Sequence, residues 1–193
     1  MPSAAATKVW ELLASVPVRA VDMDLPHQRE AGEHAEDLTS EPEGVRYEDA
    51  PEVGGFWALP PGAPPAGAVL YLFGGGYVIS APRTRHKTAG HLARASGARV
   101  LVPDYRLAPE HPFPAALDDA VRAYEWLLGD GNVPERTVVA GDSSAGGLAV
   151  ASLLVRRDAA RPQPAGAVGI SPWADLAVTG ETMRTRAAVD VCA

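Results

Sequence analysis

The stretch VVAGDSSAGGLAV, residues 138–150, runs from an apolar segment through two adjacent serines into a run of small residues. Its first half predicts a buried β-strand and its second half an α-helix, with the serines on the turn between them. Ligands of open α/β sheets bind outside the carboxyl ends of the strands. This turn is therefore the first candidate for a functional site.

The same alternation of apolar strands and helices continues on both sides of the turn. Strands are predicted at residues 68–73, 98–105, 136–141 and 165–171, and helices at 83–97, 114–131 and 145–159. One face of the second helix collects Leu117, Val121, Tyr124, Leu127 and Leu128. Apolar strands separated by helices favour right-handed crossovers, which predicts an α/β fold with a mostly parallel sheet and helices on both faces.

The first third of the chain has a different pattern. Residues 1–43 predict an N-terminal helical segment, and residues 44–193 the core. Within the segment, residues 7–16 place Val9, Leu12, Leu13 and Val16 at helical spacing, and the polar residues 28–38 are also compatible with a helix. Residues 44–50 and 53–60 alternate enough to predict edge strands, and residues 60–67, rich in proline and glycine, predict a turn.

Composition and charge narrow the function classes. The 193 residues are 47% apolar and 21% charged, which is typical of one soluble globular domain. The net charge of −7, with acids and bases mixed along the chain, argues against a nucleic-acid or anionic-membrane surface. The single cysteine, Cys192, excludes a disulfide within the chain and a cysteine-rich zinc site. No metal and no cofactor is predicted.

The location of the protein is predicted from its first residues and its apolar runs. MPSAAATKVWELLASV, residues 1–16, lacks the basic start and continuous apolar stretch of a secretory signal. No apolar run approaches the roughly 18 residues that would span a bilayer. A cytoplasmic protein without a membrane span is therefore expected.

Either serine of the turn could be a nucleophile, and their neighbours distinguish them. A nucleophile elbow needs small residues two positions before and two after the serine, because strand and helix backbones pass close together there. For Ser143 these positions hold Gly141 and Ala145. For Ser144 the earlier position holds Asp142, whose carboxylate would be forced against the helix. The pattern favours Ser143.

The turn alone also has simpler interpretations. A glycine-rich turn with a serine N-cap is common between a strand and a helix. Such a turn could also hold a phosphate, although the chain has neither a G-x-G-x-x-G pattern nor a Walker lysine here. A second motif is needed to choose between these readings.

The second motif is FGGGY, residues 73–77, at the end of the first buried strand. Acyl transfer through a serine needs donors aimed at the developing oxyanion, and glycine lets backbone amides approach the substrate closely. A structural glycine-rich turn is the alternative. Together with the serine turn, the loop favours a serine hydrolase.

At this point the sequence resembles the hormone-sensitive-lipase-like esterases of the α/β-hydrolase superfamily, from about Ala68 onward. YLFGGGYVIS (71–80) resembles their His-Gly-Gly-Gly loop and GDSSAGGLAVA (141–151) their Gly-Asp-Ser-x-Gly-Gly elbow. VPDYRLAPEHPFPAALDDA (102–120) and SPWADL (171–176) are similar to two further segments of the family.

The resemblance implies an α/β-hydrolase fold and a carboxylic ester hydrolase that acts on small esters with short-to-medium acyl chains. It implies Ser143 as the nucleophile and the backbone amides of Gly75, Gly76 and Ser144 as the oxyanion hole.

By the same resemblance the N-terminal segment, residues 1–43, is a cap. Trp10, Leu12, Leu13 and Val16 are candidates for an acyl-facing surface, or simply pack the helix onto the body.

The sequence departs from the family pattern at two positions. Phe73 stands where the family usually has histidine, and Ala145 replaces a glycine of the elbow. The family's histidine orders the loop and is not the general base, so backbone donors can survive its loss. The methyl group of Ala145 is a mild steric change.

For the segment DYRLAPE, residues 104–110, a structural role is favoured over a catalytic one. Asp104, Arg106 and Glu110 are expected to form a buried ion-pair network that holds the loop, with Pro109 setting the turn.

The general base has no candidate in the family's order, which is serine, then acid, then histidine. The histidines are His27, His34, His86, His91 and His111, and all precede Ser143. The aspartates that follow it are Asp158, Asp175 and Asp190. None of the three is convincing as the triad acid. We therefore expect a partial sequence that stops before the acid, the base and the last strands, and that leaves a sheet edge exposed.

Three functions fit these observations. The first is a serine carboxylesterase that works through an acyl-enzyme on Ser143. The second is a catalytically dead module of the same fold that binds a small ligand. The third is a general α/β domain whose serine turn binds an anion. Covalent labelling by a fluorophosphonate separates the first from the others, and a homodimer is left open.

Overall fold

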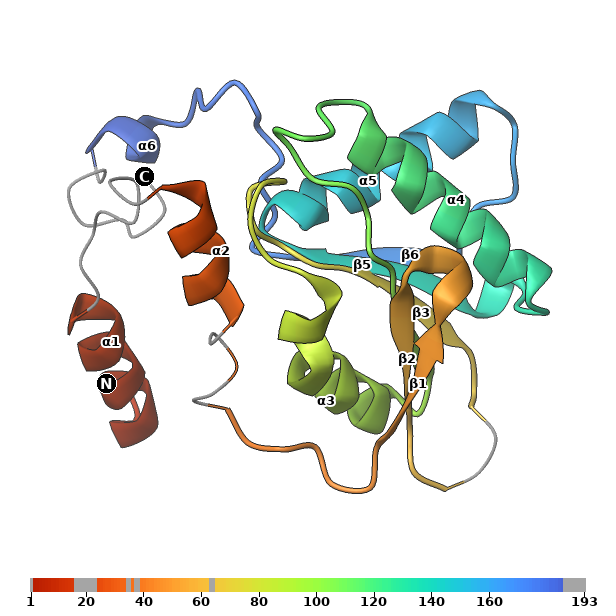
Figure 1. The fold of residues 1–193 in the computed structure, drawn as a ribbon, viewed down its shortest axis with the longest axis horizontal. Coiled ribbons are helices and arrows are strands. Elements are labelled where there is room, and N and C mark those ends of the chain that lie inside the picture. Colours follow the sequence, from red (N-terminus) through yellow and green to blue (C-terminus); the bar gives the residue numbers. More distant parts are fainter. Residues whose placement is uncertain (1, 16–23, 34–35, 37–38, 63–64, 186–193) are drawn as a thin grey trace. The chain divides into compact units, whose positions relative to one another are not determined.

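The computed structural model describes residues 2–15, 24–33, 36, 39–62 and 65–185. They belong to two compact units, residues 29–174 and residues 1–28 with 175–193. In the larger unit the described strands form one sheet of order β1-β2-β4-β3-β5-β6 (Figure 1). The strands are β1 (Arg46–Ala50), β2 (Gly55–Leu59), β3 (Ala68–Leu72), β4 (Arg99–Val102), β5 (Thr137–Asp142) and β6 (Gly166–Ile170).

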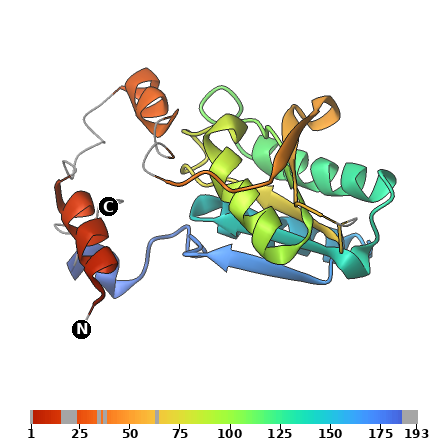
Figure 2. The same cartoon turned by 90° about the horizontal axis from the view of Figure 1, so that it is seen from below.

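The sheet is parallel from β4 through β3 and β5 to β6; β2 pairs antiparallel with β4, and β1 pairs antiparallel with β2. The predicted α/β fold class with a mostly parallel sheet is confirmed. Figure 2 shows β6 (blue) at one edge of the sheet, beside β5. The side chains of Val168 and Ile170 on β6 are about half exposed.

The prediction of edge strands was right for β1 and wrong for β2. β2 lies between β1 and β4, with Phe56 opposite Val102 and Trp57 opposite Leu101. Its central residues are buried. The sequence FWAL (56–59) is a continuous apolar run, which is the pattern of an interior strand rather than an edge.

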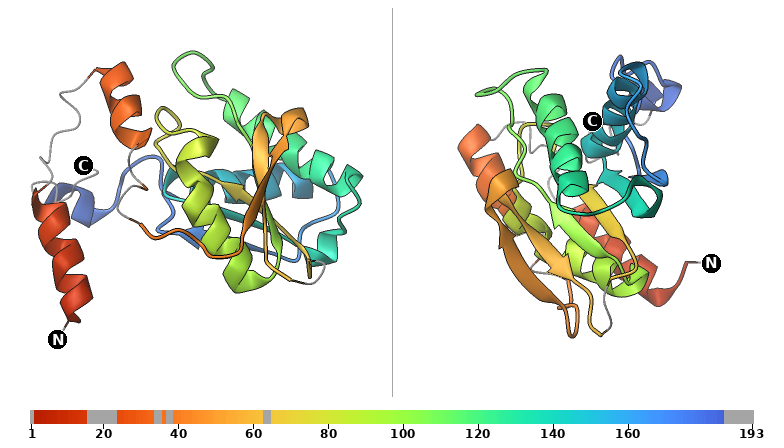
Figure 3. Two further views of the ribbon diagram at one scale, coloured as in Figure 1. Left: turned by 60° about the horizontal axis from the view of Figure 1, so that its bottom comes forward. Right: turned by 90° about the vertical axis from the view of Figure 1, so that its right-hand side faces the viewer.

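Helices cover both faces of this sheet, as predicted. The three main ones are α3 (His86–Ser96), α4 (Ala115–Gly129) and α5 (Ser144–Asp158). α3 packs on one face, against β2 and β4, and α4 and α5 pack on the other, against β3, β5 and β6 (Figure 3). Short 3-10 turns are η2 (Pro51–Val53), η3 (Pro82–Arg85) and η4 (Pro134–Arg136).

The apolar face predicted for α4 is confirmed in part: Tyr124 and Leu127 are buried, and Leu117 and Leu128 pack against the core. The buried residues of α4 are Ala115, Asp119, Ala120, Ala123, Tyr124 and Leu127. Leu117, Val121 and Leu128 are only partly buried. Alanines let the helix axis approach the sheet closely, so the small residues decide which face packs.

The N-terminus of α3 is capped by a carboxylate that is distant in the sequence. Both oxygens of Glu36 accept backbone hydrogen bonds, from the amide of Lys87 (2.8 Å) and that of Thr88 (2.8 Å). A carboxylate at a helix N-terminus satisfies free amides and complements the helix dipole. At the other end, Gly97 closes the helix with a φ of 66°, as the predicted glycine end requires.

The helices α1 (Ala4–Ser15) and α6 (Glu181–Thr185) belong to the smaller unit, and α2 (Leu25–Glu33) has residues in both units. The predicted helix at 7–16 is confirmed to Ser15, and Val16 lies outside the described residues. The helix suggested for 28–38 ends at Glu33. Trp10 is 70% exposed, whereas the side chains of Leu12 and Leu13 are outside the description. The cap role of residues 1–43 stays a prediction.

Among the described residues, no helix is long and apolar enough to cross a membrane.

The ion-pair network predicted for residues 104–110 does not form, because Arg106 has another partner. Its Nε and Nη2 donate to the two carboxylate oxygens of Asp119 on α4 (2.8 and 2.9 Å), and its backbone amide adds a third bond (2.9 Å). Asp119 is 9% exposed, and Arg122 also pairs with it. Glu110 pairs with Arg29 instead. The loop is therefore tied to α4 and α2 by separate ion pairs.

We predict that Asp119→Ala lowers the free energy of unfolding by about 2 kcal/mol, because charge-assisted hydrogen bonds to Arg106 are lost. Urea denaturation of the 193-residue chain measures the change. The matched control is Asp118→Ala on the exposed side of α4, expected to cost less than about 1 kcal/mol through the helix dipole. Equal losses in the two variants would contradict the role given to Asp119.

Candidate active site

Ser143 occupies a strained turn between β5 and α5. Its backbone angles are φ 53° and ψ −124°, a conformation that residues other than glycine rarely adopt. Three hydrogen bonds hold it: its amide donates to the carbonyl of Ile170 (3.0 Å), and its carbonyl accepts from the amides of Gly146 (3.1 Å) and Trp173 (2.8 Å). The turn is thereby fixed against the end of β6, and the Ser143 side chain is exposed.

The strand and the helix pass so closely at this turn that glycine is needed. A Cβ atom on Gly141 would lie 2.2 Å from the carbonyl oxygen of Ala145, and one on Gly146 would lie 2.6 Å from Cβ of Pro172. Ala145 itself is fully buried without displacing the turn. The departure from the family's glycine at this position is therefore accommodated.

The two serines differ in their access to solvent. Ser144 is 0% exposed, and its Oγ has no hydrogen-bond partner among the described residues. Its carbonyl accepts a bond from the hydroxyl of Tyr77 (2.8 Å). As the first residue of α5, Ser144 contributes one of the amides that have no partner within the helix. Exposure favours Ser143 as the side chain that meets a ligand.

The glycine loop, residues 73–80, follows β3, and its conformation requires its glycines. Gly75 and Gly76 have φ angles of 145° and 62°. A Cβ atom on Gly74 would lie 2.4 Å from a carboxylate oxygen of Asp142, and one on Gly75 would lie 2.0 Å from the carbonyl oxygen of Ile79. The loop therefore packs tightly against Asp142, at the end of β5, and against its own later residue Ile79.

Asp142 joins the glycine loop to the serine turn. Its Oδ1 accepts hydrogen bonds from the amide of Gly74 (2.8 Å) and from the hydroxyl of Tyr71 on β3 (2.7 Å). Burial, and then the neighbouring charge of Asp142, raise the pKa of the Tyr71 hydroxyl, which remains a donor. Sequence reasoning treated Asp142 only as a steric objection to Ser144. The parallel pairing of β3 with β5 was the missing information.

Phe73 is held by apolar contacts where the family usually has histidine. The side chain is fully buried, and its ring stacks on that of Tyr105 with 4.2 Å between centroids. The Tyr105 hydroxyl donates to the carbonyl of Phe73. The start of the glycine loop is thus ordered by packing and a tyrosine.

Two histidines of the larger unit, His86 and His91, have side-chain partners other than the serine turn. His86 packs against the rings of Tyr47 and Phe56, with centroids 5.0 and 4.2 Å apart. His91 Nε2 lies 2.9 Å from the carbonyl oxygen of Ser40. The remaining histidines are His27, which contacts Asp24, His111, whose backbone amide bonds to Leu107, and His34, which lies outside the described residues.

The candidate acids after the serine are engaged in local bonds. Asp158 pairs with its neighbour Arg157 (2.7 Å), and Asp175 accepts from the hydroxyl and amide of Thr179 (2.6 and 2.8 Å), which lowers its pKa. Asp190 lies outside the described residues. The described part of the chain therefore assigns no acid–base pair to Ser143.

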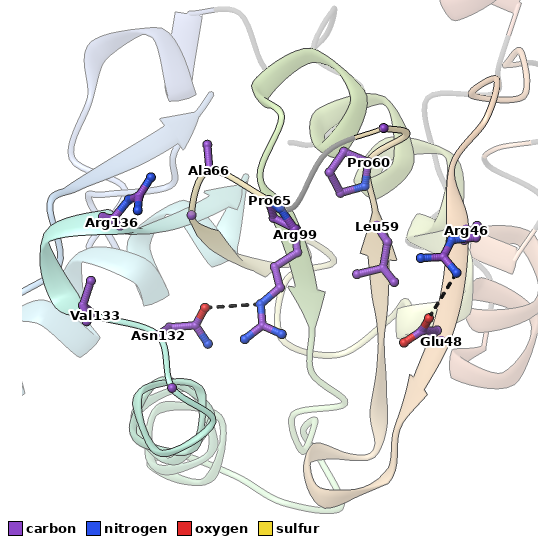
Figure 4. Close-up of a pocket in the computed structure, with 13 residues that line it drawn as sticks. Arg46, Glu48, Leu59, Pro60, Pro65, Ala66, Arg99, Asn132, Val133 and Arg136 are labelled. Atoms are coloured by element: carbon purple, nitrogen blue, oxygen red, sulfur yellow. Dashed lines mark hydrogen bonds and ion pairs between the residues drawn. The ribbon is translucent and has the colours of Figure 1, made fainter.

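A cavity of about 810 Å³ is lined by Arg99, Asn132 and Arg136, among other residues (Figure 4). Its wall includes Arg99 and Arg136, which stand at or just before the first residues of β4 and β5, whereas Ser143 and the glycine loop follow strand ends. The Arg99 guanidinium is bonded to Asn132 (3.2 Å) and pairs with Asp130 (2.7 Å). This cavity is not part of the serine site.

Comparisons place the chain among hydrolases. The family described as "alpha/beta hydrolase fold" matches residues 69–192. An acetyl-hydrolase of Streptomyces hygroscopicus is 42% identical over 174 residues, which cover 82% of this chain and 58% of the relative. A carboxylesterase/phospholipase of Mycobacterium tuberculosis is 43% identical over 109 residues, 56% of this chain and 29% of the relative.

Solved structures give the same result. An esterase/lipase from an uncultured bacterium superposes with a TM-score of 0.89 at 38% identity, covering 98% of this chain and 65% of that one. An esterase of the bacterial hormone-sensitive lipase family gives a TM-score of 0.86 at 38% identity, with 99% and 65% covered. The chain thus spans less than two thirds of the length of these relatives.

We predict that Asp142→Ala raises the hydrogen-exchange rate of the Gly74 amide by about tenfold or more, because that amide loses its acceptor. Exchange measured by NMR on the 193-residue chain tests this. Asp142→Asn is the matched control, since its side-chain oxygen still accepts, and its rate should stay within about threefold of the original. Unchanged exchange in Asp142→Ala would show that the loop does not depend on this carboxylate.

Proposed function

The chain belongs to the α/β-hydrolase family, among the hormone-sensitive-lipase-like esterases, and from this premise we propose that it carries the nucleophile and oxyanion hole of a serine carboxylic ester hydrolase. The observation that carries the proposal is the exposed Ser143 on a strained turn whose neighbour, Asp142, is bonded to the glycine loop. A shared support for nucleophile and loop is what acyl transfer requires.

In the proposed mechanism the Ser143 hydroxyl attacks the ester carbonyl. The negative charge that develops on the carbonyl oxygen is stabilised by the amides of Gly75, Gly76 and Ser144. Collapse of the intermediate expels the alcohol and leaves an acyl group on Ser143, which water then releases. The proton of Ser143 must go to a base, and no histidine follows position 143 in these 193 residues. The base is left unassigned.

The proposed substrates are small carboxylic esters with short-to-medium acyl chains. Support comes from the names of relatives, which include an acetyl-hydrolase and an ethyl acetate hydrolase of Pseudomonas putida, 38% identical over 103 residues. A cytoplasmic location, a cap formed by residues 1–43 and a homodimeric state belong to the same proposal.

A catalytically dead binding module of the same fold is the second candidate. It is favoured by one observation: in the larger unit the side chains of His86 and His91 contact Phe56 and Ser40 rather than Ser143. A fluorophosphonate distinguishes the two functions, because it labels only an activated serine.

We predict that Ser143→Ala abolishes hydrolysis of p-nitrophenyl butyrate in a version of the protein extended to the length of its relatives. Ser144→Ala should retain much of the activity, since alanine keeps the backbone amide and the Ser144 hydroxyl is buried. Initial rates of the two variants, compared with the unsubstituted protein, test the assignment. An inactive Ser144→Ala beside an active Ser143→Ala would show that the register is wrong.

We also predict that Phe73→His changes the turnover rate of the extended protein by less than about tenfold, because the donors are backbone amides. Gly75→Val should reduce it by about 10² or more, since its Cβ would collide with the Ile79 carbonyl and displace a donor. Steady-state rates on the same ester give both values. Losses of similar size would count against the backbone-donor assignment.

A further inference from the structure

The glycine loop needs support beyond its own hydrogen bonds. Within it, the amides of Val78 and Ile79 both donate to the carbonyl of Gly75 (3.0 and 2.9 Å), which closes a tight turn. Tyr77 and Ser80 have φ angles of 64° and 87°, in the region that side chains disfavour. Such a conformation is disfavoured and persists only where the surrounding structure holds it.

Arg29, in α2, bonds directly to this loop. Its Nε donates to the carbonyl oxygen of Val78 (2.9 Å), and its Nη2 donates to the carbonyl oxygen of Ala108 on the neighbouring loop (3.2 Å). The two loops are themselves joined, because the amide of Ala108 donates to the carbonyl of Tyr77 (2.8 Å). The Arg29 guanidinium therefore adds a second link between the glycine loop, at Val78, and the neighbouring loop, at Ala108.

Glu110 aims the guanidinium. Both of its carboxylate oxygens accept from Arg29, from Nη1 and Nη2 at 2.8 Å each. These bonds lower the pKa of Glu110 to about 2, so the carboxylate is charged at neutral pH. Because Glu110 binds both Nη atoms of the planar guanidinium, the Nε–H group points in a fixed direction. A lysine ammonium has no such fixed geometry.

A simple surface ion pair is the alternative explanation. The side chains of Arg29 and Glu110 are 32% and 52% exposed, and exposed pairs contribute little on their own. The two carbonyl bonds distinguish this pair from the others on the same helix. Glu33, also in α2, pairs with Arg83 of η3, and that pair has no bond to a loop carbonyl. The Glu33–Arg83 pair therefore serves as a control for the Arg29–Glu110 pair.

We propose that Arg29 is a positioning residue of the oxyanion hole, which fixes the Val78 carbonyl and through it the amides of Gly75 and Gly76. Glu110 orients the Arg29 guanidinium, and α2 is a working part of the site rather than only a cover. The proposal rests on the function proposed above for the glycine loop. The hydrogen bonds of Arg29 from which it is argued are independent of that function.

The first experiment measures loop protection in the 193-residue chain, which needs no catalysis. Arg29→Ala should raise the hydrogen-exchange rates of the Val78 and Ile79 amides by about tenfold or more, and Arg29→Lys should come close to it. The matched control Arg83→Ala removes the other ion pair of α2 and should change these rates by less than about twofold. Equal effects of Arg29→Ala and Arg83→Ala, or full protection in Arg29→Lys, would overturn the proposal.

The second experiment measures kcat and KM for p-nitrophenyl butyrate in the protein extended to its relatives' length. A positioning role predicts that Arg29→Ala lowers kcat by about tenfold or more with KM within about twofold, because misplaced donors weaken only the transition state. Glu110→Gln should follow in the same direction, and Arg83→Ala should leave both constants unchanged. A raised KM with an unchanged kcat would contradict the role. If the unsubstituted protein shows no turnover that depends on Ser143, the proposed function is refuted. The hydrogen-exchange result on the support of the loop by Arg29 would still hold.

Discussion

The close approach of β5 and α5 across Ser143 is the constraint from which the rest of the site follows. A Cβ atom at Gly141 would lie 2.2 Å from the carbonyl oxygen of Ala145, so the strand and the helix approach closely and the chain turns sharply between them. That turn forces Ser143 into a disfavoured conformation, which costs on the order of 1–3 kcal/mol. The bonds to Ile170 and Trp173 offset this cost and leave the hydroxyl exposed.

The glycine loop is coupled to the turn rather than placed beside it independently. The carboxylate of Asp142 and the hydroxyl of Tyr77 connect the two segments, and on its outer side Arg29 bonds to the loop. Electrostatic stabilisation of an oxyanion is effective only when the donors are in position before charge develops. The bonds that converge on this short loop support the oxyanion role proposed for it.

Residue types and spacing were sufficient to predict the fold class, the serine turn and the glycine loop, because strand, turn and glycine patterns are local. The partners of Arg106, Glu110 and Glu36 were not predictable in this way. Each of these bonds joins residues that are distant in sequence, and which pair forms depends on strand register and helix rotation. The helix α4 illustrates the second point: of its predicted apolar face, Tyr124 and Leu127 are buried, whereas Leu117 is only partly buried because the alanines lie closest to the sheet. β2 was misread because alternation was given more weight than its continuous apolar run.

The central claim is that Ser143 and the amides around it form one preorganised oxyanion site. The most direct test is a crystal structure of the protein, extended to its relatives' length, after reaction with a small alkyl fluorophosphonate. The account predicts a covalent adduct on Ser143 Oγ, with the phosphoryl oxygen about 2.7–3.1 Å from the amide nitrogens of Gly75, Gly76 and Ser144. An adduct on another residue, or a phosphoryl oxygen turned away from the glycine loop, would contradict it.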